Sequence, residues 1–155
     1  MTPAALADEP VLRRLMELYL HDFSELDGAE VGEHGTYGYP YMGLYSLEAH
    51  RHPFLVRVDG RFAGFALVRA GPTHHMAEFF VLRRYRRRGV GLVVARDVFA
   101  RFPGAWSVHE IPGNDAAVKF WRHAIPVPFS EDTDDDGTTQ HFVQPPPSPE
   151  DRPAG

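Results

Sequence analysis

The sequence predicts one domain of the mixed α/β class. Its 155 residues match the size of a single domain. Its composition, 43% apolar and 24% charged, is that of a globular protein with its own core. Helix-like and strand-like segments alternate along the chain, which favours a mixed sheet flanked by helices. We expect the domain over residues 1–144, and we expect the proline-rich end, residues 145–155, to be disordered.

The N-terminal half predicts a helix, an irregular segment and a hairpin. Residues 8–23 carry apolar side chains at intervals of three and four, which is typical of an amphipathic helix. Residues 27–45 are rich in Gly and Tyr without a period, so they form either a plain connection or the aromatic wall of a cleft. Two apolar runs, 54–58 and 62–68, flank an Asp-Gly pair, the usual sequence of a tight hairpin turn.

The C-terminal half predicts a central strand, two strand–helix connections and a closing hairpin. The first strand is apolar on both faces and is therefore expected at the centre of the sheet. Asn114 or Asp115 is the expected N-cap of the last helix. The predicted elements are a strand over 75–82, a helix over 90–102, a strand over 105–111, a helix over 116–123, and strands over 127–130 and 138–143.

The net charge of −5 describes no single surface, because the charges are segregated. Five arginines lie between positions 83 and 88, whereas residues 131–136 are acidic and form either a solvated hairpin loop or a surface that attracts a cationic substrate. The absence of cysteine excludes a disulfide scaffold and thiol catalysis. The apolar runs are too short to span a membrane and no signal-peptide pattern is present, so we expect a cytoplasmic protein without a membrane partner. The histidines lack carboxylates at ligand spacing, and we expect no metal.

The strand–loop–helix segment from Phe79 to Phe102 carries the strongest functional signal. Its loop contains Gly89 and Gly91, which allow a tight turn and leave room for a ligand to approach the backbone. Free N–H groups and the helix dipole attract anions at such a helix start, and the arginines add charge. We therefore predict a pyrophosphate site. The loop does not match the Walker motif or the dinucleotide-binding motif. Nucleic-acid binding is only the third alternative for the function, because the positive charge is confined to one loop of an acidic chain.

Two sequence blocks resemble one family. Arg86-x-x-Gly89-x-Gly91, after a Phe-Phe-Val-Leu strand, resembles the acetyl-CoA signature of the GNAT superfamily of N-acyltransferases. The segment 114–121, Asn-x-x-Ala-x-x-Phe-Trp, is similar to the family's Asn-x-x-Ala-x-x-Phe-Tyr. The order of the blocks and of the flanking elements, from about residue 6 to residue 144, also fits. The resemblance implies a GNAT-like fold, whose central sheet splays between the strand ending at Val81 and the next one.

The resemblance implies acetyl-CoA as the acetyl donor, held along both blocks. Backbone groups of the central strand would bind the pantetheine arm, the loop and helix start would bind the pyrophosphate, and the second block would lie nearer the thioester. Asn114 is also expected to cap its helix. The implied residues are Phe79, Phe80 and Val81, then Arg86, Arg87, Arg88, Gly89, Val90, Gly91 and Leu92, and finally Asn114, Phe120 and Trp121.

Acetyl transfer to an amine needs a base for the amine, a donor for the oxyanion and a proton for the thiolate. Glu78 and His109 are the candidate bases, with Glu110 as a further candidate, although each could be structural. The resemblance places an oxyanion donor at a backbone N–H near Val81. Trp121 stands where the family has its tyrosine acid, and an indole does not release a proton at neutral pH. A tyrosine of residues 37–45 could substitute, the thiolate could leave unaided, or the reaction could be impaired.

The sequence therefore predicts an N-acetyltransferase that moves an acetyl group from acetyl-CoA directly to an amine of a small molecule or peptide. A cysteinyl intermediate is excluded because the chain has no cysteine. The alternative is a non-catalytic acyl-CoA-binding or regulatory domain of the same family. Such domains often pair through their C-terminal strands, which makes a homodimer a further expectation.

Overall fold

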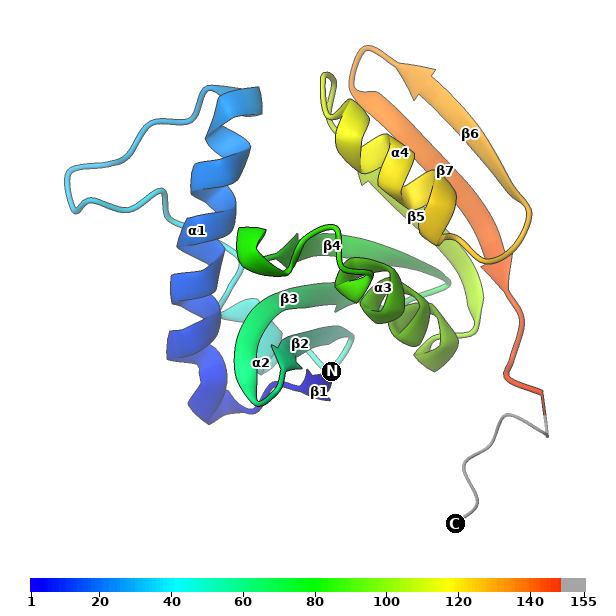
Figure 1. Cartoon of the computed structure of the whole chain (residues 1–155), viewed down its shortest axis with the longest axis horizontal. Helices are drawn as coiled ribbons and strands as arrows, with labels where there is room; N and C mark the ends of the chain where they lie inside the picture. The colour runs from blue at the N-terminus through cyan, green and yellow to red at the C-terminus, as the bar shows by residue number, and fades with distance from the viewer. Residues whose placement is uncertain (149–155) are drawn as a thin grey trace.

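The computed structural model describes residues 1–148, which form one seven-stranded mixed sheet with helices on both faces (Figure 1). The strand order is β1-β2-β3-β4-β5-β7-β6. The elements are β1 (Thr2–Pro3), the 3-10 helix η1 (Leu6–Asp8), α1 (Glu9–Asp27), α2 (Leu44–Leu47), β2 (Arg51–Val58), β3 (Arg61–Arg69), β4 (Thr73–Val81), the 3-10 helix η2 (Arg83–Tyr85), α3 (Val90–Arg101), β5 (Gly104–Glu110), α4 (Asp115–Ala124), β6 (Phe129–Asp134) and β7 (Gly137–Gln144).

The predicted mixed α/β class and the predicted splay are confirmed. β4 and β5 are parallel, but they pair only over residues 73–75 and 105–107. Beyond this point the two strands diverge (Figure 1), while β5 stays paired with β7 along its whole length. β4 is held on its other side by β3 as far as Val81. The divergence leaves one edge of β4 without a strand partner among the described residues.

A bulge in β4 decides which side chains face each layer. The β3 register changes from Leu67↔Glu78 to Val68↔Met76, so Ala77 is an extra residue. As a result Met76 and Phe79, three positions apart, both pack against the core under α3 and α4. Glu78 points instead toward the face covered by α1, where its carboxyl group interacts with the Tyr19 hydroxyl. A regular strand would have placed Met76 and Phe79 on opposite faces.

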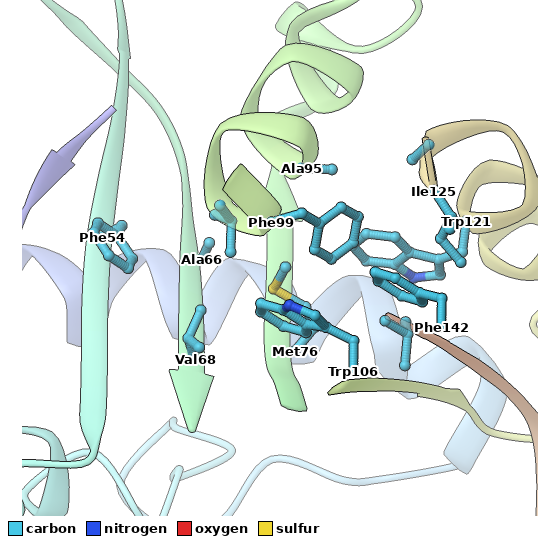
Figure 2. Packing of buried hydrophobic residues seen from close by; sticks show 13 residues of the cluster. Phe54, Ala66, Val68, Met76, Ala95, Phe99, Trp106, Trp121, Ile125 and Phe142 are labelled. Carbon is cyan, nitrogen blue, oxygen red and sulfur yellow. The ribbon is translucent and has the colours of Figure 1, made fainter. Parts of the chain in front are cut away.

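The two larger hydrophobic cores hold the sheet between its helices, and a smaller one includes Val56, Tyr85 and Val94. One of the two larger cores lies under α3 and α4, where Phe99, Trp106, Trp121 and Phe142 make edge and stacked aromatic contacts (Figure 2). The other lies under α1, whose Leu12, Leu15 and Met16 are buried against the sheet. Because β4 contributes to both cores, its position is fixed on both faces.

The hairpin of residues 51–69 forms as predicted, with Asp59 and Gly60 at φ of 50° and 74° in the turn. The last hairpin differs from the prediction. Its first strand, β6, runs over Phe129–Asp134, so most of the acidic stretch lies in an edge strand and the expected acidic loop is only a tight turn. Acidic side chains suit an edge strand because they discourage pairing with another chain.

The expected disordered tail lies partly outside the described residues. Residues 145–148 have no regular secondary structure, and residues 149–155 are not described. No helix within residues 1–148 is long and apolar enough to cross a membrane. Within the same residues, no group of three or more His, Asp or Glu side chains is placed to hold a metal ion.

Candidate active site

The loop before α3 presents a row of free N–H groups. Arg87 and Gly89 take positive φ values of 57° and 78°, so the chain turns twice before the helix begins. The first bond of the helix runs from the Val93 N–H to the Gly89 carbonyl, at 3.1 Å. In the described part of the chain, no N–H group from Arg87 to Leu92 donates to a protein acceptor. This geometry at the positive end of a helix fits a pyrophosphate.

Gly91 sits where the loop meets an aromatic wall. A Cβ at this position would lie 3.2 Å from Cε2 of Phe120 and 3.6 Å from Cγ2 of Val81. Phe120 stacks on Phe79 with ring centroids 5.6 Å apart, and Trp121 contacts both rings. The wall therefore lies directly against the loop, and any side chain at position 91 would press on the Phe120 ring.

The free edge of β4 supplies further backbone donors. The Leu82 N–H donates to the Ala63 carbonyl on β3, at 2.8 Å. Because backbone groups alternate along a strand, the N–H groups of Phe79 and Val81 point into the gap. The backbone of Phe80 faces β3, so the structure places only two of the three predicted pantetheine contacts at the gap.

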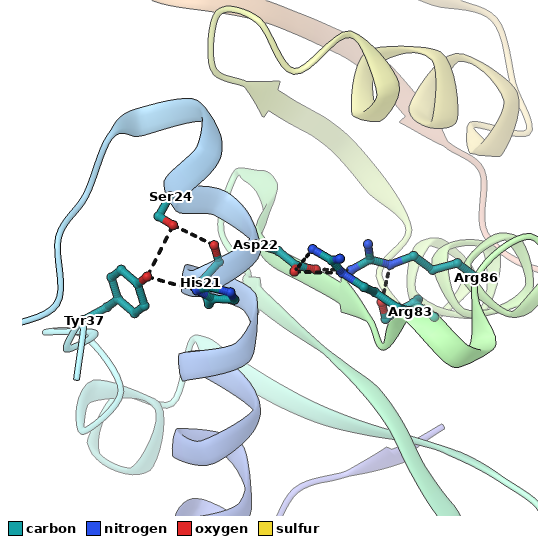
Figure 3. Close-up of polar contacts among 7 residues, drawn as sticks. His21, Asp22, Ser24, Tyr37, Arg83 and Arg86 are labelled. Carbon is teal, nitrogen blue, oxygen red and sulfur yellow. Dashed lines mark hydrogen bonds and ion pairs between the residues drawn. The ribbon is translucent and has the colours of Figure 1, made fainter. Parts of the chain in front are cut away.

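The arginine run divides into paired and solvent-facing side chains. Asp22 on α1 binds Arg83 at 2.6 Å and Arg86 at 2.5 Å (Figure 3). Burial opposes the charge of Asp22, but the two guanidinium groups outweigh it and lower the pKa of this carboxyl. Arg87 and Arg88 are exposed, and the Arg88 guanidinium lies over the Tyr85 ring at 6.0 Å. The side chain of Arg86 is thus committed to the protein, whereas Arg87 and Arg88 remain on the outside of the loop.

A partly buried carboxylate, Glu110, lies at the inner end of the gap. The Trp121 indole donates to its Oε1 at 2.5 Å, and the Asn114 amide donates to its Oε2 at 2.9 Å. The pKa of Glu110 is raised to about 7, mainly by burial and also by the negative charge of Glu78. The two hydrogen bonds act in the opposite direction, because they stabilise the charged form. The Asn114 Oδ1 also accepts from the Ala117 N–H at 3.4 Å, so Asn114 caps α4 as predicted.

Glu78 lies on β4, on the face covered by α1, and its charge acts on Glu110. Burial raises the pKa of Glu78, and the hydroxyl groups of Tyr19 and Tyr39, which stabilise the charged form, oppose this. Tyr39 comes from the Gly- and Tyr-rich segment, for which the sequence left open a connection or a cleft wall. Tyr19 was predicted only as part of the apolar face of its helix, and no sequence signal connected it to Glu78.

His109 lies away from these groups. Its side chain is exposed, and its Nδ1 lies 2.9 Å from Oγ1 of Thr139 on β7. Trp106 and Val108 are buried on one face of β5, and Glu110 shares that face. The alternation of buried and exposed residues along β5 was the signal that favours Glu110 over His109.

A family model described as the acetyltransferase (GNAT) family matches residues 12–124. The chain therefore belongs to the GNAT acetyltransferase family. No curated protein sequence matches the chain.

Solved structures of the same family share the fold at low sequence identity. An acetyltransferase from Thermus thermophilus has a TM-score of 0.71 and 18% identity, covering 93% of this chain and 94% of that one. The ribosomal-protein-S18-alanine N-acetyltransferase of Escherichia coli has a TM-score of 0.64 and 13% identity, covering 96% and 95%. The aminoglycoside acetyltransferase AAC(6')-Ib, in complex with coenzyme A, has a TM-score of 0.65 and 13% identity, covering 92% and 93%. At these identities the likeness extends to the fold, and the acceptor differs among the neighbours.

Proposed function

We propose that the protein is an N-acetyltransferase that uses acetyl-CoA and acetylates an amine of a small molecule or peptide by direct transfer. The row of free N–H groups from Arg87 to Leu92, beside the unpaired edge of β4, carries this proposal. Glu110, a partly buried carboxylate with a pKa of about 7, lies in the same gap and has the pKa required of a base acting at pH 7.

The residues along the gap fit acetyl-CoA. The N–H groups of Arg87 through Leu92 would hold its pyrophosphate, and the exposed Arg87 and Arg88 would add charge. The two free N–H groups of β4, those of Phe79 and Val81, would be shared between the pantetheine arm and the thioester carbonyl. When bound, acetyl-CoA supplies a thioester carbonyl that an amine can attack.

Glu110 is the proposed general base. A primary amine is mostly protonated at pH 7, with a pKa near ~10.4, and attacks only after losing a proton. Glu110 accepts this proton, directly or through a water, and its elevated pKa makes the transfer less uphill than it would be to an ordinary glutamate. Trp121 and Asn114 fix the carboxylate in one orientation through its two oxygens. Glu78 adds negative charge that favours a cationic acceptor at the gap.

The other polar groups of the gap have complementary roles. The Val81 N–H is the proposed donor to the oxyanion. The Trp121 N–H is committed to Glu110, so the residue that replaces the family's tyrosine here orients the base and supplies no acid. The single hydroxyl proton of Tyr39 is donated to Glu78, so Tyr39 orients that carboxylate, and the thiolate leaves unaided and takes its proton from water.

The test is thiol release from acetyl-CoA across a panel of amines, together with the mass of each product. Amine-dependent release and a mass increase of one acetyl group would support the proposal. Binding of acetyl-CoA without release for any amine would instead identify a non-catalytic acyl-CoA-binding domain. A lack of binding would contradict both functions.

A further inference from the structure

The carboxylate of Asp22 is an unexpected group beside a site for an anion. It lies on α1, more than 60 positions before the arginines that it binds, so nothing local in the sequence requires it. A negative charge near an anion site weakens anion binding by repulsion. The presence of Asp22 is explained if the gain in anion affinity from an ordered loop exceeds the loss in affinity from charge repulsion.

Arg86 joins Asp22 to the end of β4. Its Nε donates to the Val81 carbonyl at 2.7 Å, while its Nη2 donates to Oδ2 of Asp22 at 2.5 Å. The guanidinium also lies 5.6 Å from the centre of the Phe80 ring. Three contacts therefore fix this side chain at the point where β4 ends and the anion-binding loop begins. Arg86 acts here through the fixed fork of its guanidinium, a geometry that lysine cannot reproduce.

Arg83 secures the other oxygen of Asp22. Its Nη2 and Nε lie 2.6 Å and 3.1 Å from Oδ1, so each carboxylate oxygen accepts from a different arginine. The Asp22 side chain is only 20% exposed, against 70% for Arg83 and 41% for Arg86. A carboxylate that is mostly buried and bound on both oxygens is a firmer anchor than an ordinary surface ion pair.

The same turn of α1 is braced on its opposite side (Figure 3). The Tyr37 hydroxyl lies 3.1 Å from Nδ1 of His21 and 3.3 Å from Oγ of Ser24. One turn earlier, the Glu17 carboxylate accepts from the Tyr37 N–H at 2.7 Å. This part of α1 is therefore held by the segment that follows it, and Asp22 is carried on a supported helix.

We propose that Asp22 is a positioning residue for the anion-binding loop, acting through Arg86 and Arg83 to hold the end of β4 and the N–H row of Arg87–Leu92 in the geometry that binds pyrophosphate. The proposal rests on the proposed function, since it assigns acetyl-CoA to this loop. It gives Arg86 a role in orienting the loop, in place of direct contact with phosphate.

The experiment is calorimetric titration of acetyl-CoA, and separately of inorganic pyrophosphate, into the wild type and three variants. Asp22→Asn is expected to raise both dissociation constants about tenfold, the scale of one charge-assisted hydrogen bond. Arg86→Lys keeps the positive charge but loses the fork, and is expected to weaken binding to a similar extent. Asp97→Asn removes a comparable Asp–Arg pair on the exposed side of α3 and is expected to leave both constants unchanged.

A second readout separates positioning from general destabilisation. Acetyl-pantetheine lacks the pyrophosphate, so its KM is expected to rise much less than the KM of acetyl-CoA when Asp22 is replaced by Asn. Unchanged affinity of Asp22→Asn for acetyl-CoA would overturn the proposal. Tighter binding would also overturn it, because Asp22 would then compete with the phosphates for the arginines. An Arg86→Lys variant that bound acetyl-CoA as tightly as the wild type would also overturn the proposal. That result does not depend on whether the Asp22 variant folds.

The two proposals fail in different ways. If the wild type binds pyrophosphate but no acetyl-CoA, the proposed function fails and the pyrophosphate titrations still decide the role of Asp22. If the wild type binds both ligands and the variants match it, only the role of Asp22 fails. If the wild type binds neither ligand, both proposals are wrong.

Discussion

The two ends of the gap between β4 and β5 are built in opposite ways. The outer end is backbone: free N–H groups from Arg87 to Leu92, open to solvent and ordered by two positive φ values. The inner end consists of two partly buried side chains, Glu110 and Glu78, which bind the aromatic residues Trp121, Tyr19 and Tyr39. The outer end suits a ligand with fixed negative charge, whereas the inner end suits a group that gains and loses a proton.

This difference separates binding from chemistry. Changes at the outer end should alter the dissociation constant of acetyl-CoA, and changes at the inner end should alter the rate and its pH dependence. The two ends are joined by Phe120, which lies against Gly91 and contacts Trp121, the donor to Glu110. A variant that affected both properties equally would weaken the distinction.

The largest effect is expected for Gly91→Asp. The new side chain would start 3.2 Å from the Phe120 ring and place a carboxylate among the N–H groups. We expect the dissociation constant of acetyl-CoA to rise by at least about a hundredfold, from combined steric and charge repulsion. Calorimetry measures it, with Val93→Asp as the control, because Val93 is 68% exposed on the same helix. Equal losses in both variants would show that added charge on α3, and not the loop geometry, decides binding.

The second largest effect is expected for Glu110→Gln. The amide cannot accept the proton of the amine, so kcat should fall about a hundredfold, the scale of general base catalysis. The dissociation constant of acetyl-CoA should change little. Steady-state kinetics on the best amine of the panel measures both, and Asp132→Asn, which removes a carboxyl that is 81% exposed on β6, serves as the control. A variant with unchanged kcat would mean that Glu110 is structural.

A smaller effect is expected for Trp121→Phe, which removes the indole N–H from Glu110. That hydrogen bond lowers the pKa of Glu110, so its loss should move the acidic limb of the rate profile to higher pH, by about one unit. The loss of buried volume should also destabilise the fold by about 1–3 kcal/mol. The pH dependence of kcat/KM and thermal unfolding are the measurements. An acidic limb that stayed in place would indicate that Trp121 does not tune the base.

A further effect is expected in the pH dependence of stability. The ordinary pKa of glutamate is 4.5, and burial raises that of Glu110 to about 7, so between these values the folded state keeps a proton that the unfolded state has lost. The free energy of unfolding should therefore fall as pH rises through this window. Glu110→Gln should remove this part of the slope in denaturant titrations at several pH values. The rate should change in the opposite direction and rise with pH, because the base must be ionised. An identical slope in the variant would contradict the raised pKa.

The outer end of the gap could be predicted from the sequence because its residues are consecutive in the chain. Glycines, arginines and the helix start follow one another within a few positions, so local rules of backbone conformation were sufficient. The three long helices, the first hairpin and the central position of β4 were predicted for the same reason, although α1 extends to Asp27, beyond its predicted end. In the last hairpin the second strand was predicted correctly, but the first was predicted too early and too short, because its extent depends on pairing with β7 and acidic residues are unusual in a strand.

The inner end was only partly readable because it is assembled from distant segments. Glu110 meets Trp121 eleven positions later, and Glu78 meets Tyr19 from α1 and Tyr39 from a segment without periodicity. His109 and Glu110 are neighbours in sequence, and only the alternation of side chains between the two faces of β5 distinguishes them. Asp22 and Arg86 are 64 positions apart, and no local sequence pattern predicts the bond between them.

The central claim is that backbone amides at the start of α3 bind acetyl-CoA. Its most direct test is a titration of isotopically labelled protein with acetyl-CoA, followed by the amide resonances of residues 87–92. The account predicts saturable shifts concentrated in these amides and in those of Phe79 and Val81, with little change at the hairpin of β6 and β7. Saturation without shifts at residues 87–92 would contradict it.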